Sequence, residues 1–119
     1  MNEQVQTELK KILHDRISTS ESTRTTYARG EDTYDPILSK AVVFPETNEE
    51  VSKILSLCNE NKIPVVPFGT GTSLEGNVVG NDKGITISLE KMNKILSVNV
   101  EDFDCRVQAC VTREQLNDY

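Results

Sequence analysis

The residues best suited to binding chemistry lie in one short stretch, directly after the apolar run from Ile63 to Phe68. There the chain changes to glycine, threonine and serine over residues 69 to 73, with one more glycine at position 76. Glycine accepts positive φ and has no side chain to keep a ligand away from the backbone. Successive N–H groups of such a loop can face one concavity and bind an anion. The spacing indicates a phosphate-binding loop, although an ordinary tight connection between two strands fits it equally well.

Two better-known phosphate motifs do not fit this stretch. The dinucleotide fingerprint G-x-G-x-x-G begins correctly at Gly69 but meets Leu74 where its third glycine belongs. The P-loop pattern begins correctly at Gly71 but has Asn77 in place of the lysine that reaches the phosphates. The following residues, 77 to 84, are too rich in Gly, Asn and Asp for a helix. The loop is therefore expected to be neither a nucleotide-hydrolase loop nor a turn resting on a helix N-terminus.

The strand before the loop is predicted to close a strand–helix–strand unit. A short apolar strand covers Ala41 to Phe44. Thr47 and Glu50 form the capping box T-x-x-E, which predicts a helix over Asn48 to Asn61. Apolar residues at offsets 0, 3, 4 and 7 predict the face that packs on a sheet: Val51, Ile54, Leu55 and Cys58. The two strands of this unit are expected to pair in parallel through a right-handed crossover.

Three later segments alternate along the chain, which is typical of half-exposed antiparallel strands. They cover Gly84 to Leu89, Ile95 to Val100 and Phe103 to Ala109. The residues expected to face inward are Ile85, Ile87, Leu89, Leu96, Val98, Val100, Phe103, Cys105, Val107 and Ala109, with Thr86 and Ser88 on the opposite face. A second capping box, T-x-x-Q from Thr112 to Gln115, opens a last helix. The predicted fold class is α+β, a βαβ unit followed by antiparallel strands.

The first 40 residues are expected to form an amphipathic helix and a polar arm, separate from a domain over residues 41–119. The helix is predicted over residues 3 to 17, with one apolar face made by Val5, Leu9, Ile12 and Leu13. His14 falls opposite this face and is interpreted as a solvated surface residue. The arm, from Ser18 to Asp35, is dense in Ser, Thr, Arg and Asp, with a short helix near Ser22 to Tyr27.

Composition excludes several classes of function. The 119 residues suffice for one domain with a real core. The net charge is -6, without a Lys/Arg cluster, so a nucleic-acid partner is not expected. No apolar run is long enough to span a membrane, and no signal peptide is recognised at the start. Three cysteines without C-x-x-C spacing, Cys58, Cys105 and Cys110, indicate reduced thiols, no metal site and a cytoplasmic location.

The glycine loop resembles the FAD pyrophosphate loop of the FAD-linked oxidases, of the vanillyl-alcohol oxidase and p-cresol methylhydroxylase type. The matching sequence is Pro-Phe-Gly-Thr-Gly-Thr-Ser-Leu-Glu-Gly at residues 67 to 76. Its Ser-Leu-Glu-Gly ending is most similar to the branch with cytochrome-type D-lactate dehydrogenase and the glycolate oxidase flavin subunit. The similarity continues in residues 41 to 58 and 107 to 117, and covers about Ala41 to Tyr119.

The resemblance implies the first part of an FAD-binding domain, in an oxidoreductase that passes hydride from a D-2-hydroxy acid of the D-lactate or glycolate class to the flavin. FAD is expected to bind without a covalent link. Loop amides would bind its pyrophosphate, threonine and serine hydroxyls would add hydrogen bonds, and a proline would fix the start of the loop. The cofactor-binding residues implied are Pro67, Gly69, Thr70, Gly71, Thr72, Ser73 and Gly76.

The same resemblance leaves the later flavin-contacting segments and the substrate domain without counterparts in these residues. No catalytic residue is therefore assigned, and the chain alone is expected to be inactive and to retain FAD weakly. Two positions depart from the family pattern: Asn77 stands at a typical histidine, and Cys110 at a typical glycine. A side chain at position 110 is expected to conflict with close ligand approach or with a glycine-only backbone.

Alternative hypotheses are a decayed or truncated remnant that folds without flavin, and a small non-catalytic interaction module. The partners expected are a small-molecule substrate held by a further domain, and either a second copy of the chain or a complementary chain carrying the rest of the enzyme. Exposed apolar surface at such a boundary would favour self-association.

Overall fold

The computed structural model describes residues 2–31 and 34–119. Ten helices and strands follow one another along these residues. In chain order they are α1 Glu3–Leu13, β1 Ile17–Ser18, α2 Glu21–Thr26, β2 Ala41–Val43, α3 Asn48–Glu60, β3 Val65–Phe68, β4 Ile85–Ser88, β5 Ile95–Asn99, β6 Asp104–Val107 and α4 Arg113–Asn117.

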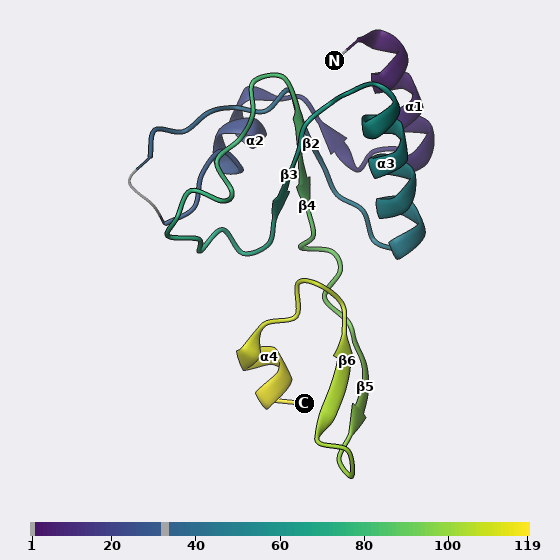
Figure 1. Cartoon of the computed structure of the whole chain (residues 1–119), viewed down its shortest axis with the longest axis vertical. Coiled ribbons are helices and arrows are strands. Elements are labelled where there is room, and N and C mark those ends of the chain that lie inside the picture. The colour runs from purple at the N-terminus through teal and green to yellow at the C-terminus, as the bar shows by residue number, and fades with distance from the viewer. Residues whose placement is uncertain (1, 32–33) are drawn as a thin grey trace.

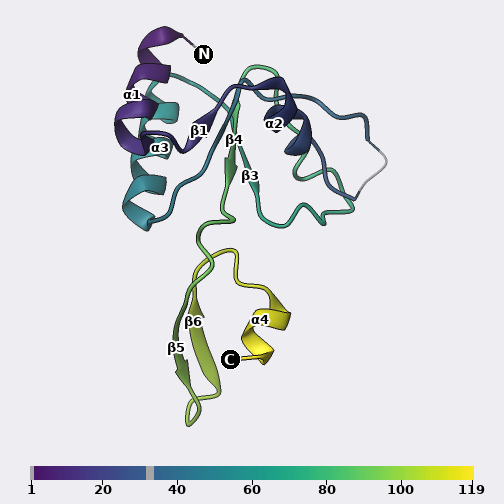
Figure 2. The ribbon, with the colours of Figure 1, turned by 180° about the vertical axis from the view of Figure 1, so that it is seen from behind.

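The larger sheet has the strand order β1-β2-β4-β3, while β5 and β6 form a separate two-stranded sheet. Helices α1 and α3 lie together on one side of the larger sheet, and α2 lies on the other side (Figure 1). Seen from behind, the β5–β6 hairpin and α4 extend away from this sheet (Figure 2). The α+β class predicted from the sequence is confirmed.

Strand β4 is central and runs parallel to both β2 and β3. The predictions that β2 and β3 pair directly, and that residues 84–89 form an antiparallel strand, are wrong. All four residues of β4 are buried, including Thr86 and Ser88. The Thr86 hydroxyl is hydrogen-bonded to the Ser39 hydroxyl at 2.7 Å, and a hydrogen-bonded polar group can be buried at little cost. Thr86 and Ser88 therefore do not mark a solvent-exposed face of β4.

The core lies between the sheet and the helices α1 and α3. Its buried members come from α1, β2, α3 and β4: Val5, Leu9, Leu13, Ala41, Val43, Ile54, Cys58, Ile85 and Ile87. Of the inward positions predicted for the first helix and for β4, Val5, Leu9, Leu13, Ile85 and Ile87 are confirmed, whereas Ile12 and Leu89 are only partly buried against this core. Because α1 contributes to the same core as residues 41–87, the first 40 residues and the sheet share one hydrophobic interior; the division of the chain at residue 40 stays a prediction.

The first helix is shorter than predicted and the arm is more ordered. Helix α1 ends at Leu13, and His14 takes a positive φ of 58°. The chain then enters β1, where Ile17 pairs with Val43 in antiparallel register. The short helix expected in the arm is present as α2, capped by the Ser20 side chain. An exposed His14 agrees with its interpretation as a surface residue.

Helix α3 confirms its predicted cap and most of its predicted face. The Thr47 hydroxyl accepts a hydrogen bond from the Glu50 N–H at 3.2 Å. Ile54 and Cys58 are fully buried, whereas Leu55 is 46% exposed. The predicted burial of Leu55 is therefore wrong.

The β5–β6 hairpin is antiparallel as predicted, with Val98 opposite Cys105 and a bulge between Ile95 and Ser97. Its predicted inward residues, however, are exposed: Leu96, Val98, Val100, Phe103, Cys105, Val107 and Ala109. Phe103 is 96% exposed at the turn. Alternation alone does not bury a strand, and here no other layer of the described residues covers that face.

Strand β3 forms one edge of the larger sheet, and Pro67 lies in it opposite Ile87. The Pro64 carbonyl accepts a hydrogen bond from the Ile85 N–H at 3.0 Å, and the Phe68 carbonyl accepts one from the Leu89 N–H at 2.9 Å. Backbone groups alternate in direction along a strand, so Pro67 turns its nitrogen toward the open side. Its missing N–H therefore removes no hydrogen bond from the sheet.

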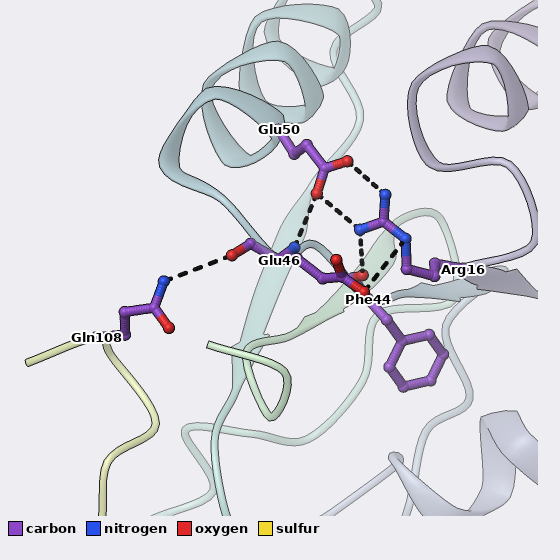
Figure 3. A network of polar contacts seen from close by, with 5 residues as sticks. All are labelled: Arg16, Phe44, Glu46, Glu50 and Gln108. Carbon is purple, nitrogen blue, oxygen red and sulfur yellow. Dashed lines mark hydrogen bonds and ion pairs between the residues drawn. The ribbon is translucent and has the colours of Figure 1, made fainter. Parts of the chain in front are cut away.

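A polar network joins α3 to the segment between α1 and β1 (Figure 3). The Arg16 guanidinium donates to both carboxylate oxygens of Glu50, at 2.7 and 2.5 Å, and to the Phe44 carbonyl at 3.2 Å. Glu50 also accepts from the Glu46 N–H at 2.8 Å. From the hairpin side, the Gln108 amide donates to the Glu46 carbonyl at 3.5 Å. The network thus reaches from the core helix toward the hairpin.

Candidate phosphate-binding site

The glycine loop leaves the end of β3 in a conformation that requires glycine. Gly71 and Gly76 have φ values of 75° and 76°, a region that other residues rarely adopt. A Cβ added to Gly71 would lie 2.6 Å from the Phe68 ring. The backbone at Gly71 is thus packed directly on the last side chain of the strand, which keeps the first part of the loop close to the sheet.

A second segment, residues 28 to 31, holds the loop from the other side. The Glu31 N–H donates to the Ser73 carbonyl at 2.9 Å, and the Gly80 N–H donates to the Ala28 carbonyl at 3.0 Å. A Cβ added to Gly30 would lie 2.8 Å from the Ser73 carbonyl oxygen. Only a glycine at position 30 allows the two backbones to approach this closely.

Between these segments lies a pocket of about 630 Å³, a size ordinary for small-molecule sites. Gly69, Thr70 and Gly71 form part of its wall. The remaining residues around it come from the end of α2, from the segment at residues 28–31, from the end of β3 and from residues 90–115: Thr26, Tyr27, Arg29, Gly30, Glu31, Phe68, Glu90, Asn93, Cys110 and Gln115. Glycine backbone on one wall leaves room for a phosphate to approach the loop, so the residues present fit a phosphate-bearing ligand.

The residues proposed from the sequence do not all face this pocket. Ser73 uses its carbonyl to bind Glu31, and its hydroxyl accepts from the Glu75 N–H at 3.4 Å. The hydroxyls of Thr70 and Thr72 are 3.2 Å apart and hydrogen-bond each other. Gly76 lines a different cavity, of about 520 Å³, beside Tyr34. The structure thus brings Gly69, Thr70 and Gly71 together at one pocket. Pro67 is not in the pocket wall, but it directly precedes Phe68, which is.

An aromatic cluster supports the floor of the pocket. The Tyr27 ring packs edge-on against both Phe68 and Phe44, with centroids 5.0 and 5.5 Å apart. Its hydroxyl donates to a Glu90 carboxylate oxygen at 2.5 Å. Burial, together with the Glu90 carboxylate, raises the pKa of Tyr27 to about 12. The phenol therefore stays protonated at neutral pH and keeps Glu90 beside the pocket.

Cys110 lies across from the start of the loop. Its sulfur is 3.9 Å from the position a Cβ on Gly69 would take, and its N–H donates to the Met92 carbonyl at 2.9 Å. Among the described residues other than glycine, positive φ occurs at His14, Lys62 and Phe103. The expected backbone conflict at Cys110 is therefore wrong, because this position does not need a glycine-only conformation. Burial, and then the charge of Glu90, raise the pKa of its thiol, which makes it a poor nucleophile.

Sequence reasoning missed the segment at residues 28–31, which it assigned to a polar arm. The one available signal was Gly30, a glycine among polar residues, since a lone glycine often marks close approach of another backbone. It also missed Gln115, whose side-chain amide donates to the Asn93 carbonyl at 2.6 Å beside the pocket. Asn77, the second departure from the family pattern, is exposed and lines neither cavity.

Within residues 2–31 and 34–119, no group of three or more His, Cys, Asp or Glu side chains is placed to hold a metal ion. In the same residues, no helix combines the length and the apolar character that crossing a membrane requires. The three cysteines are free thiols.

Comparison with known families gives one match, to the family described as FAD binding domain, over residues 39–119. The chain is 39% identical over 103 residues to a probable mitochondrial D-lactate dehydrogenase of Danio rerio, covering 87% of this chain and 21% of that protein. It is 36% identical over 114 residues to a mitochondrial D-lactate dehydrogenase (cytochrome) of Arabidopsis thaliana, covering 94% of this chain and 20% of that protein. It is 37% identical over 68 residues to the glycolate oxidase subunit GlcD of Bacillus subtilis, covering 57% and 14%. The chain thus spans about a fifth or less of these relatives.

Solved structures show the same fold. Alkyldihydroxyacetonephosphate synthase superposes with a TM-score of 0.89 at 21% identity, over 99% of this chain and 26% of that one. p-Cresol methylhydroxylase with substrate bound superposes with a TM-score of 0.85 at 26% identity, over 98% and 24%. The resemblance drawn from the glycine loop and its flanking elements is confirmed by these matches.

Proposed function

This chain belongs to the FAD binding domain family, and on that premise we propose that it is the part of a flavin-dependent oxidoreductase that holds the FAD pyrophosphate. The amides of residues 69 to 73 bind the phosphates in this proposal. The observation that supports it is the pocket wall made by Gly69, Thr70 and Gly71, where glycine leaves the backbone accessible. A hydrogen bond from a backbone amide to a charged phosphate is stronger than one to a neutral group.

Each neighbouring residue has a part in positioning the loop. Pro67 restricts φ just before the loop begins. The Phe68 ring lies under Gly71 and fixes the turn, because any side chain there would collide with it. The hydroxyls of Thr70, Thr72 and Ser73 supply additional donors, and Gly76 ends the loop with positive φ. When bound, FAD supplies the hydride acceptor of the reaction, and these residues only bind and orient it.

The substrate proposed for the whole enzyme is a D-2-hydroxy acid of the D-lactate or glycolate class. Relatives named D-lactate dehydrogenase and glycolate oxidase subunit support this class. The described residues offer no group to which a catalytic role is assigned, so this chain alone is proposed to be inactive. The cytoplasmic location inferred from the cysteines stays a prediction, and two of the relatives are named as mitochondrial.

The binding proposal is tested by titrating the isotope-labelled chain with FAD and with ADP, while following backbone amide shifts. The largest shifts are expected at residues 69 to 73. Shifts concentrated elsewhere would overturn the loop assignment. Gly71→Val should abolish binding, and Thr70→Val, which leaves the glycine backbone intact, should weaken it. Thr7→Val, a matched change of an exposed threonine in α1 outside the pocket lining, serves as the control.

The activity proposal is tested with D-lactate or glycolate, FAD and a dye acceptor. The chain alone should give the same rate of dye reduction as buffer. Dye reduction that depends on both the substrate and the chain would contradict the proposed inactivity. A purified chain that keeps stoichiometric FAD through gel filtration would contradict the weak FAD retention expected of it.

A further inference from the structure

We propose that Arg29 is a second contact for the cofactor's phosphates, placed opposite the glycine loop on the other wall of the pocket. This inference rests on the proposed function and adds a cationic side chain to a site otherwise made of backbone amides and hydroxyl groups. Arg29 lies in the segment that the sequence alone assigned to a polar arm.

The first support is location. Arg29 and Gly30 line the same pocket of about 630 Å³ as Gly69, Thr70 and Gly71. The two walls are joined by the hydrogen bond from the Glu31 N–H to the Ser73 carbonyl, at 2.9 Å. Arg29 is therefore connected to the glycine loop through its neighbours Gly30 and Glu31, which contact Ser73.

The second support is the close fit of Gly30 against the loop. A Cβ at this position would lie 2.8 Å from the Ser73 carbonyl oxygen and 3.1 Å from that of Gly71. The Arg29 guanidinium also donates to the Tyr34 carbonyl at 3.2 Å, and the Tyr34 ring packs on Gly76. Gly30 thus contacts the loop near Gly71 and Ser73, and Tyr34, which is hydrogen-bonded to Arg29, contacts it at Gly76. These contacts position Arg29 relative to the loop.

The third support is charge. Among the described residues that line the pocket, the charged side chains are Arg29, Glu31 and Glu90. Without Arg29 the lining would carry only carboxylates, which repel a pyrophosphate. A guanidinium presents five N–H donors in a planar fork, so one bond to Tyr34 leaves others for a phosphate. Arginine also binds phosphate in a bidentate way that lysine does not reproduce.

The experiment compares the full-length chain with Arg29→Gln, Arg29→Lys and the control Arg106→Gln, which removes the same charge from the exposed hairpin strand β6. ADP and adenosine are the probes, and binding is measured by calorimetry and by amide shifts. Arg29→Gln should weaken ADP binding by roughly tenfold to a hundredfold, as expected for a lost charged hydrogen bond. Adenosine binding should not change, because adenosine has no phosphate. Arg29→Lys should recover part of the ADP affinity, and Arg106→Gln should match the unchanged chain.

The outcomes separate this inference from the function on which it rests. If ADP shifts the amides of residues 69 to 73 and Arg29→Gln binds it as well as the unchanged chain, the role of Arg29 is wrong while the loop assignment stands. If the unchanged chain does not bind ADP, both are wrong. An equal loss for ADP and adenosine would mean that Arg29 only supports the fold. An equal loss of ADP affinity in Arg106→Gln would mean that the effect comes from the net charge of the chain alone. Each of these last two results would overturn the inference.

Discussion

The sheet formed by β1 to β4 and the hairpin formed by β5 and β6 use similar sequence patterns with opposite results. In β4, apolar residues alternate with threonine and serine, and every residue is buried. In β6, apolar residues alternate with charged ones, and every residue is exposed. The difference lies in the neighbours, since β4 has a strand on each side and its sheet has helices on both sides (Figure 1), while β6 pairs with β5 alone.

This contrast shows where the stability of the chain resides. An isolated two-stranded hairpin is marginally stable in water, because it has no second layer on which to bury its side chains. The hairpin here is tied to the rest by a few polar contacts, including those from Gln108 to Glu46 and from Cys110 to Met92. The sheet with α1 and α3 should therefore fold as the stable unit, with the hairpin depending on it.

The largest effect is expected from Ile54→Ala in α3. Ile54 is fully buried, so its truncation should lower the free energy of unfolding by about 2–5 kcal/mol. The matched change Leu96→Ala, in the hairpin at 56% exposure, should cost less than about 0.5 kcal/mol. Urea unfolding followed by circular dichroism measures both. A loss below about 0.5 kcal/mol for Ile54→Ala would refute the assigned core face.

Acid should destabilise the sheet unit through Glu50. The hydrogen bond from Arg16 is the main cause that lowers the pKa of Glu50 from 4.5 to about 2. Because the folded pKa is the lower one, the pair stabilises the fold above about pH 4.5, and this contribution is lost as the pH falls toward about 2. We expect a loss of about 1–2 kcal/mol after solvent screening.

The control for this prediction is Glu49→Gln, an exposed neighbour in the first turn of the same helix. The unfolding free energies of the unchanged chain and Glu50→Gln should differ near neutral pH and converge in acid, whereas Glu49→Gln should follow the unchanged chain throughout. A constant difference for Glu50→Gln across this pH range would show that the ion pair is not the acid-sensitive element.

The hairpin should carry the self-association proposed for this chain. Its exposed apolar side chains, among them Leu96, Val98 and Phe103, form a surface that water disfavours. The double variant Leu96→Gln, Val98→Thr should raise the dissociation constant by about tenfold, as lost apolar burial predicts. Leu74→Gln, a similar change in the glycine loop, should leave it unchanged. Sedimentation equilibrium measures it, and a monomer at all concentrations would contradict the proposal.

The smallest effect is expected at the boundary between the two regions, where Tyr27 donates to Glu90 just after β4. Tyr27→Phe should cost about 0.5–1 kcal/mol, the net contribution of one hydrogen bond. The folded pKa of Tyr27 is raised from 10.0 to about 12, so its contribution is present below about pH 10 and is lost as the pH rises through about 12. Tyr119→Phe, at 77% exposure, is the control. Equal urea midpoints for the two variants at pH 7 would show that the hydrogen bond from Tyr27 to Glu90 does not stabilise the fold.

Local signals in the sequence predicted the elements better than their arrangement. The caps at Thr47 and Thr112 were correct because a capping hydrogen bond depends on residues three positions apart. The parallel partners of β4 were missed, because burial of Thr86 depends on Ser39, 47 residues away in the chain. The exposure of Phe103 was missed for the opposite reason, since a sequence does not show whether another layer covers a strand.

The candidate site was partly predictable in the same way. The glycine loop is continuous in the sequence, so its residue types could be read directly, and Gly71 indeed has positive φ. Arg29 and Gly30 were not assigned, because their place beside the loop follows from the tertiary fold and not from a local pattern. Gln115 was read only as a cap, although its side chain also reaches Asn93 beside the pocket.

Pro67 has a consequence for how this chain can pair with other chains. One edge of the larger sheet is β3, where Pro67 has no N–H to donate to an incoming strand. The opposite edge is the two-residue strand β1. Neither is a good template for an incoming β-strand. The hairpin has two unprotected margins without proline. Any β-augmentation, whether useful recruitment or harmful polymerisation, should therefore begin at β5 or β6 and spare the sheet beside the glycine loop.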